Sequence, residues 1–131
     1  MIKSADEFKA LRESDNQEEY SRAATDEAPL EVWLEVLLKY PDLAFWVAQN
    51  KSVPIEILEK LALNEDSKVR DMVARKRKLP ENIMLLLAED SSESVRLALA
   101  NNAKITKKVL EKLVNDSWQE VRNKAMEKLA L

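Results

Sequence analysis

The residue types that most often carry out catalysis are missing from this chain or stand where catalysis is disfavoured. There is no His, Cys or Gly, which excludes imidazole bases, Ser-His-Asp and Cys-His arrangements, the usual zinc and iron–sulfur sites, and glycine-rich phosphate loops. Carboxylate pairs such as Glu18-Glu19 and Asp26-Glu27 lie in polar segments, whereas catalytic carboxylate pairs need burial. We therefore expect a protein that is not an enzyme and that needs no metal or cofactor.

Four consecutive cations form the most conspicuous polar motif. They are Arg75, Lys76, Arg77 and Lys78, and with Lys104 they are candidate phosphate-binding residues. The alternative is structural, because cations at the C-terminal end of a helix are favoured by about 0.3–1 kcal/mol each.

The charge distribution weakens the nucleic-acid hypothesis. Residues 1–42 carry 5 basic and 11 acidic side chains, and residues 43–131 carry 16 and 13. A nucleic-acid-binding protein usually has a strong excess of basic side chains, but the pI of this chain is about 5.2. This asymmetry favours a protein partner, although a local basic edge remains open.

The second half of the chain repeats with a period of 26 residues. A Val-Arg pair recurs at Val69-Arg70, Val95-Arg96 and Val121-Arg122, and apolar pairs recur in step with it. Each copy predicts two helices, the first beginning near Pro54, Pro80 or Thr106 and the second carrying the Val-Arg pair. A shorter copy begins at Pro29, with Leu43-Ala44 in place of Val-Arg.

Neither helix of a copy can bury its apolar stripe alone, so successive copies must stack. The expected fold is all-α: a short right-handed α-solenoid of about four two-helix repeats over residues 29–131, preceded by a helical cap over residues 1–28. The longest apolar run, residues 83–88, is far shorter than the roughly 20 residues of a membrane span, and the charged N-terminus has no signal core. We expect a cytoplasmic protein with no membrane-spanning segment.

The motif Pro-x-x-Ile-Leu-x-x-Leu-Ala-x-Asp/Asn, followed by Val-Arg-x-x-Val-Ala-x-Asn, resembles the HEAT-like repeats, and closely the bacterial leucine-rich repeat variant. The resemblance covers residues 29–131 and implies a binding scaffold rather than one activity. One relative of the variant type carries a Cys-ligated iron–sulfur module, which a chain without Cys cannot hold. Some HEAT-like proteins are DNA glycosylases, but none of their catalytic motifs matches here.

The resemblance also implies a structural ladder between repeats. Its expected members are the Arg of each Val-Arg pair and the residue six positions before it: Arg70, Arg96 and Arg122, with Asn64, Asp90 and Asp116. The alternative is that the repeated Arg residues bind phosphates along a groove.

The resemblance implies that the second helix of each repeat lines the concave surface. Its outward positions predict a partner-binding face, which comprises Phe45, Trp46, Lys68, Asp71, Met72, Arg75, Leu97 and Asn101. Aromatic side chains, Met and Arg are enriched at protein interfaces. Trp46 and Met72 have packing between repeats as an alternative role, and Trp118 is either a contact anchor or a cover for the end of the core.

The sequence therefore predicts a protein-binding scaffold that uses this concave face. A small bacterial regulatory or immunity-type protein is the suggested setting. The alternative is nucleic-acid binding through Arg75–Lys78 and Lys104–Lys108, and a HEAT-like DNA glycosylase is a third, lesser alternative.

Overall fold

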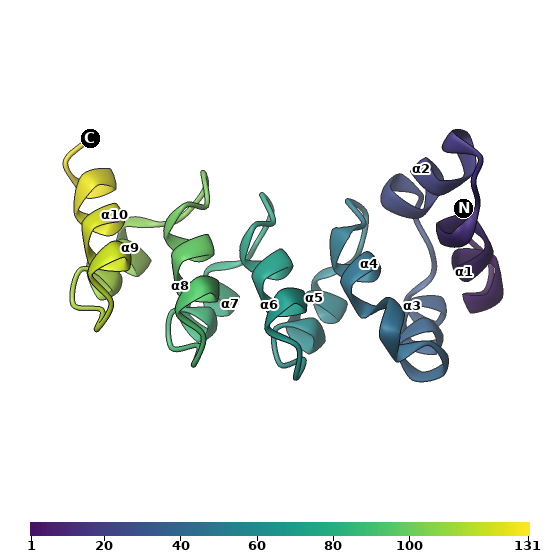
Figure 1. Ribbon diagram of the computed structural model, residues 1–131, viewed down its shortest axis with the longest axis horizontal. Coiled ribbons are helices and arrows are strands. Elements are labelled where there is room, and N and C mark those ends of the chain that lie inside the picture. The colour runs from purple at the N-terminus through teal and green to yellow at the C-terminus, as the bar shows by residue number, and fades with distance from the viewer. The chain divides into compact units, whose positions relative to one another are not determined.

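The computed structural model describes residues 1–131 and is entirely helical, with ten α-helices, one 3₁₀ helix and no β-strand (Figure 1). The helices are α1 (Ala5–Glu13), α2 (Gln17–Thr25), α3 (Leu30–Lys39), η1 (Pro41–Leu43), α4 (Ala44–Gln49), α5 (Ile55–Leu61), α6 (Ser67–Ala74), α7 (Glu81–Leu87), α8 (Glu93–Ala100), α9 (Lys107–Leu113) and α10 (Gln119–Leu129). None of them is long and apolar enough to cross a membrane. The all-α prediction is confirmed.

The chain divides into two compact units, unit 1 (Met1–Leu61) and unit 2 (Ala62–Leu131). Unit 1 contains α1 to α5, and unit 2 contains α6 to α10. The expected cap, residues 1–28, lies within unit 1 together with α3 to α5.

Unit 1 is built around an aromatic pair. Phe8 of α1 and Trp33 of α3 are completely buried, and their rings meet edge to face with centroids 5.4 Å apart. Ser4 caps the N-terminus of α1, and its hydroxyl accepts the amide N–H of Glu7 at 3.0 Å. Asn16 caps α2, and its side chain accepts the amide N–H of Glu19. These caps satisfy N–H groups that have no partner inside a helix.

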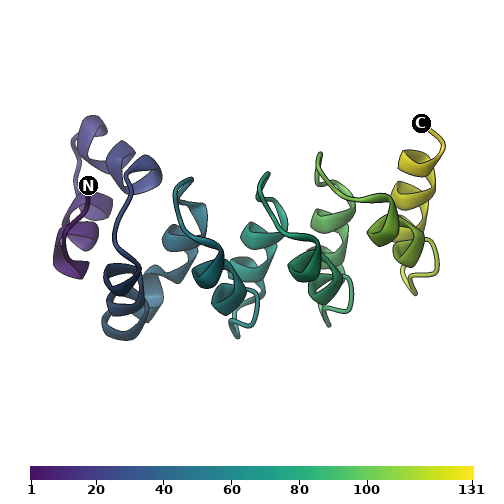
Figure 2. The ribbon, with the colours of Figure 1, turned by 180° about the vertical axis from the view of Figure 1, so that it is seen from behind.

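Unit 2 repeats one local design. Helices α6, α8 and α10 contact one another in order, and α7 contacts α9; the view from behind shows the same succession (Figure 2). The apolar columns of the sequence form the core, since the following residues are buried: Val69, Val73, Ile83, Met84, Leu87, Val95, Leu99, Val109, Leu110, Leu113, Val121 and Ala125.

The turns need no left-handed backbone, and no residue has a positive φ. Asn64, Asp90 and Asp116 each accept the main-chain N–H two residues further on, at 2.9, 2.9 and 2.8 Å. Asn and Asp favour such turns because their short side chains reach the nearby backbone. This column therefore shapes the turn that leads into each of α6, α8 and α10.

Candidate functional site

Two identical ion pairs join neighbouring copies in unit 2. The guanidinium of Arg70 donates to both carboxylate oxygens of Asp90, at 2.8 and 3.2 Å. Arg96 binds Asp116 in the same way, at 2.8 and 3.3 Å. The four side chains are 6–14% exposed. Both oxygens of each carboxylate are engaged, in the fork-to-fork geometry that makes such pairs strong.

The remaining nitrogen of each guanidinium, Nη1, binds the turn that precedes the helix carrying the Arg. Nη1 of Arg70, Arg96 and Arg122 donates to the main-chain carbonyl six residues earlier, at 2.7, 2.7 and 2.8 Å. The expected ladder is therefore corrected in one respect. The residue six positions before each Arg supplies a main-chain carbonyl, and for Arg70 and Arg96 the carboxylate comes from the Asp 20 positions ahead. Arg70 and Arg96 already have partners for their donors, so these two do not form a row of free phosphate-binding groups.

One of the Arg–Asp pairs, Arg96–Asp116, is also connected to a Trp. Asp116, the carboxylate partner of Arg96, accepts the main-chain N–H of Trp118 at 2.8 Å through Oδ1. Trp118 directly precedes α10 and is half-buried. The ion pair with Arg96 and the turn that carries Trp118 thus depend on the same carboxylate.

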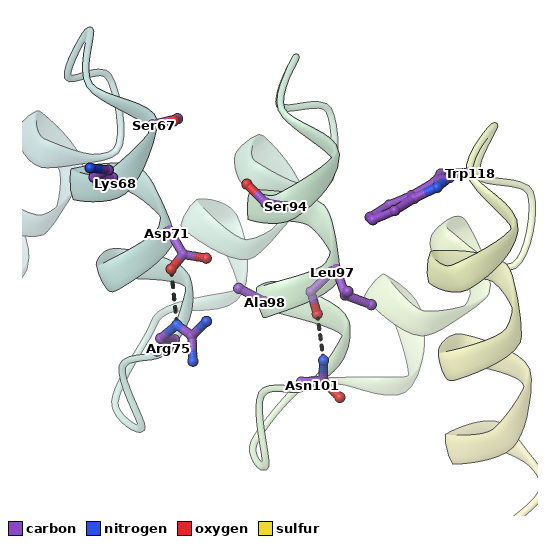
Figure 3. Close-up of a pocket in the computed structure, with 9 residues that line it drawn as sticks. All are labelled: Ser67, Lys68, Asp71, Arg75, Ser94, Leu97, Ala98, Asn101 and Trp118. Carbon is purple, nitrogen blue, oxygen red and sulfur yellow. Dashed lines mark hydrogen bonds and ion pairs between the residues drawn. The ribbon is translucent and has the colours of Figure 1, made fainter.

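A hollow of about 270 Å³ lies beside this Trp in unit 2, and we call it the groove. Figure 3 shows its lining side chains projecting from α6, from α8 and from the turn before α10. Five residues of the predicted binding face line it, together with Trp118: Lys68, Asp71, Arg75, Leu97 and Asn101. Met72 is half-buried and does not line the groove.

The groove combines an apolar part with a charged rim. Trp118, half-buried Leu97 and buried Ala98 supply the apolar part. On the rim, Nε of Arg75 lies 3.1 Å from the Asp71 carboxylate, and exposed Lys68 has no ion-pair partner. Such a surface suits the capture of a side chain by packing and charge; it contains no nucleophile–base pair.

Phe45 and Trp46, the other two members of the predicted face, belong to unit 1. Their rings meet edge to face at 4.9 Å, and both side chains are half-buried. The guanidinium of Arg12 lies 3.4 Å from the centre of the Trp46 ring. Its Nε is buried without a hydrogen-bond partner. The sequence analysis missed Arg12, because no repeat relates it to Trp46, 34 positions away.

The predicted phosphate-binding residues lie on two loops of unit 2 that Asn102 ties together. Nδ2 of buried Asn102 donates to the carbonyls of Ala74 and Lys76, at 2.8 and 2.9 Å, and its Oδ1 accepts the N–H of Lys104. Arg77, Lys78 and Lys104 are exposed and have no ion-pair partner. We call these three the basic edge. Lys76 is half-buried, and Arg75 belongs to the groove.

An exposed leucine stripe is a further surface that the sequence analysis missed. Leu30, Leu34 and Leu38 of α3 are 38%, 42% and 86% exposed. Their spacing of four residues places them on one helix face, and the sequence alone could have predicted this shared face. These leucines lie outside the repeated apolar columns, and those columns predict only the buried positions.

The clearest pKa shift of an acidic side chain occurs in unit 1, at Asp6. Lys39 and Tyr40 both donate to Oδ1 of Asp6, the former at 2.9 Å. These hydrogen bonds lower the pKa of Asp6, the one from Lys39 most. In unit 2, burial lowers the pKa of Lys128, whose Nζ donates to the carbonyl of Asn102 at 2.8 Å. Both arrangements join helices to neighbouring segments and lie outside the groove.

No cluster of three or more potential metal-ligating side chains is present. Comparison of the chain with family models, with characterised proteins and with solved structures finds no match.

Proposed function

We propose that this chain is a non-enzymatic protein-binding module whose binding site is the groove of unit 2. In this proposal the chain is a short right-handed solenoid of HEAT-like repeats that acts as a scaffold, in the manner of a small bacterial regulatory or immunity-type protein in the cytoplasm. The repeated sequence columns and the two identical Arg–Asp pairs support the repeat architecture. Stacked repeats commonly serve as binding surfaces.

One observation carries the proposal: the groove holds a half-buried Trp beside a half-buried Leu, with charged side chains around them. Residues that dominate binding energy are enriched in Trp and Arg and sit in pockets from which neighbours exclude water. Trp118 and Arg75 both line this groove. Because Asp116 accepts the main-chain N–H of Trp118 and also pairs with Arg96, the backbone that carries this Trp is fixed before any partner arrives, which reduces the entropy lost on binding.

The test is photo-crosslinking in cells, followed by reconstitution. A photoreactive amino acid replaces Ser94, an exposed residue of the groove, or Glu111, an exposed residue outside it. The protein crosslinked from position 94 is then purified, and its affinity is measured for wild type and for Leu97→Ser/Trp118→Ala. We expect adducts from position 94 only and an affinity loss of about tenfold or more.

The matched control is Leu86→Ser, a change of the same kind at an exposed position outside the groove; it should leave the affinity unchanged. Circular dichroism checks that each variant folds. Equal crosslinking from both positions, or an unchanged affinity in the groove variant, would contradict the proposal.

A second candidate, nucleic-acid binding, is favoured by the unpaired cations of the basic edge. It predicts that binding to single-stranded or duplex DNA weakens steeply with salt and is lost in Arg77→Ser/Lys78→Ser/Lys104→Ser. The absence of DNA binding would exclude this candidate, and DNA binding that survives the triple change would show that the basic edge is not its site.

A further inference from the structure

The groove has two chemically different ends. Figure 3 shows Trp118 and Ser94 toward one end and Arg75 and Asn101 toward the other. Helix α8, which runs between them, has eight residues, so it is about 12 Å long. An extended peptide rises about 3.3 Å per residue, and roughly four residues therefore span the groove.

The Arg75 end continues into the basic edge. Arg75 directly follows α6, and Arg77 and Lys78 come next in the same loop. The loop after α8 holds Lys104 and is tied to the first loop by Asn102. Residues 75–80 and 101–106 contain no acidic side chain. The only charged side chains that these two loops offer to a segment leaving the groove at this end are therefore cations.

The lining of the groove, like the two loops, has a net positive charge. Asp71 is the one carboxylate of the lining, and it is paired with Arg75, whereas Lys68 has no acidic partner. A cationic segment would find no free carboxylate here, but an anionic segment would find unpaired Lys68 inside the groove and the unpaired cations of the basic edge beyond the Arg75 end. Opposite charge across an interface steers encounter and rejects wrong partners.

From this geometry we infer that the groove takes an extended, acidic segment of a partner protein. The segment places one apolar side chain against Trp118 and Leu97, and its carboxylates, about four residues away, lie on the basic edge. This inference rests on the proposed function and specifies the chemistry of the partner.

A protein segment fits better than a nucleic acid. Single-stranded nucleic acids bind with successive bases stacked on successive aromatic side chains, and the groove offers one aromatic ring beside aliphatic Leu97 and Ala98. The whole chain also carries a net charge of −3, which opposes the approach of a polyanion.

The experiment is selection of a random peptide library of about 12 residues against the full chain. Selected peptides are synthesised with a fluorescent label, and their affinities are measured by anisotropy. The variants are the groove variant, Leu97→Ser/Trp118→Ala, and the edge variant, Arg77→Ser/Lys78→Ser/Lys104→Ser. The edge variant has a control with the same change in net charge, Lys3→Ser/Lys51→Ser/Lys60→Ser, which removes three exposed cations of unit 1. A single-stranded DNA of about 20 nucleotides is the comparison ligand.

The expected result is a set of peptides with one apolar residue and at least two carboxylates about four residues away. Their binding should fall about tenfold or more in both the groove variant and the edge variant, and much less in the unit 1 control. Selected peptides that need the groove but lack acidic residues would overturn the inference and leave the proposed function standing. A library that yields no groove-dependent peptide would overturn both. DNA binding that depends on the edge, in the absence of acidic peptides, would overturn the inference in favour of a nucleic-acid surface.

Discussion

The two units of this chain join their helices in different ways. In unit 2, the same bidentate Arg–Asp pair occurs twice with the same sequence separation. Unit 1 has Leu43-Ala44 where the Val-Arg pair stands elsewhere, and it relies on individual contacts: Phe8 against Trp33, Arg12 on Trp46, and Asp6 with Lys39. A repeated contact is visible in one sequence, whereas a contact made once leaves no periodic trace.

The units also differ in charge. Unit 1 carries 7 basic and 13 acidic side chains, and unit 2 carries 14 and 11. The exposed cations of unit 2 that are not used in ion pairs are those of the basic edge, Lys68, and Lys107 and Lys108 at the start of α9. Paired charges in unit 2 therefore serve the fold, and unpaired charges are the ones available to a partner.

One polar contact is common to both units. Asn50 donates through Nδ2 to the carbonyls of Ala23 and Asp26, and its Oδ1 accepts the N–H two residues further on. Asn102, 52 positions later, bonds to Ala74, Lys76 and Lys104 in the same pattern. The same Asn contact thus occurs in both units although the Arg–Asp pair does not, and the equivalent position between the two Asn residues holds Lys76.

The largest expected effect is in the core of unit 1. Phe8→Ala should lower the free energy of unfolding by about 3–5 kcal/mol, because it empties a fully buried ring site against Trp33. Chemical denaturation measures the loss, and amide hydrogen exchange locates it. Phe8→Leu is the control and should cost much less, since it keeps most of the volume. A small effect of Phe8→Ala would mean that unit 1 does not depend on its aromatic pair.

In unit 2 the matching change is Arg96→Ala. It leaves the Asp116 carboxylate 6% exposed without its cation, and breaking such a buried pair costs about 3–5 kcal/mol. Arg122 is the internal control, because it donates to the carbonyl of Asp116 but has no carboxylate partner. Arg122→Ala should therefore cost about 0.5–1.5 kcal/mol.

Equal losses in these two Arg variants, measured by urea denaturation, would show that the carboxylate contributes nothing. A double-mutant cycle of Arg96→Ala with Asp116→Asn isolates the energy of the pair from the effect of each substitution alone.

A smaller effect is expected at the Asn contact that both units share. Asn102→Ala leaves the carbonyls of Ala74 and Lys76 without this partner, at a cost of about 1–3 kcal/mol. Asn50→Ala should cost a similar amount in unit 1. Melting temperatures of the two variants, measured side by side, test the comparison directly. A large loss of melting temperature in one Asn variant and none in the other would show that the two contacts share their geometry but not their contribution to stability.

The smallest effect is expected at Asp6, whose ion pair is exposed to solvent. The pKa of Asp6 is lowered by Lys39 and Tyr40, so its ionised form stabilises the fold above the pKa of an unfolded Asp, about 3.9. This contribution disappears as pH falls through the lower pKa of the folded state. Asp6→Asn should therefore melt slightly below wild type at neutral pH, and the difference should vanish in acid. A constant difference across the pH range would exclude this linkage.

The predictions from sequence succeeded where a residue type recurs in a column. The apolar columns identified the helices and their buried faces, and the Arg column identified residues that bind the neighbouring turns. The carboxylate partner of Arg96 was predicted wrongly, because periodicity relates Asp90 and Asp116 equally to the Arg and cannot tell which carboxylate the stacked helices bring within reach. The predicted binding face stays a prediction, although five of its eight residues line one groove.

The sequence by itself determined the helical class, the buried columns, the absence of the usual catalytic side chains and the excess of acidic residues near the N-terminus. These follow from residue type and from the helical period, which are local properties. Only the tertiary structure decided that Asp116 holds both Arg96 and Trp118, that Arg12 lies on Trp46, and that Trp118 joins Leu97 in a groove. The contacts of Arg96 with Asp116 and of Arg12 with Trp46, and the meeting of Trp118 with Leu97, join side chains from different helices or turns, and the packing of those elements sets the distances between them.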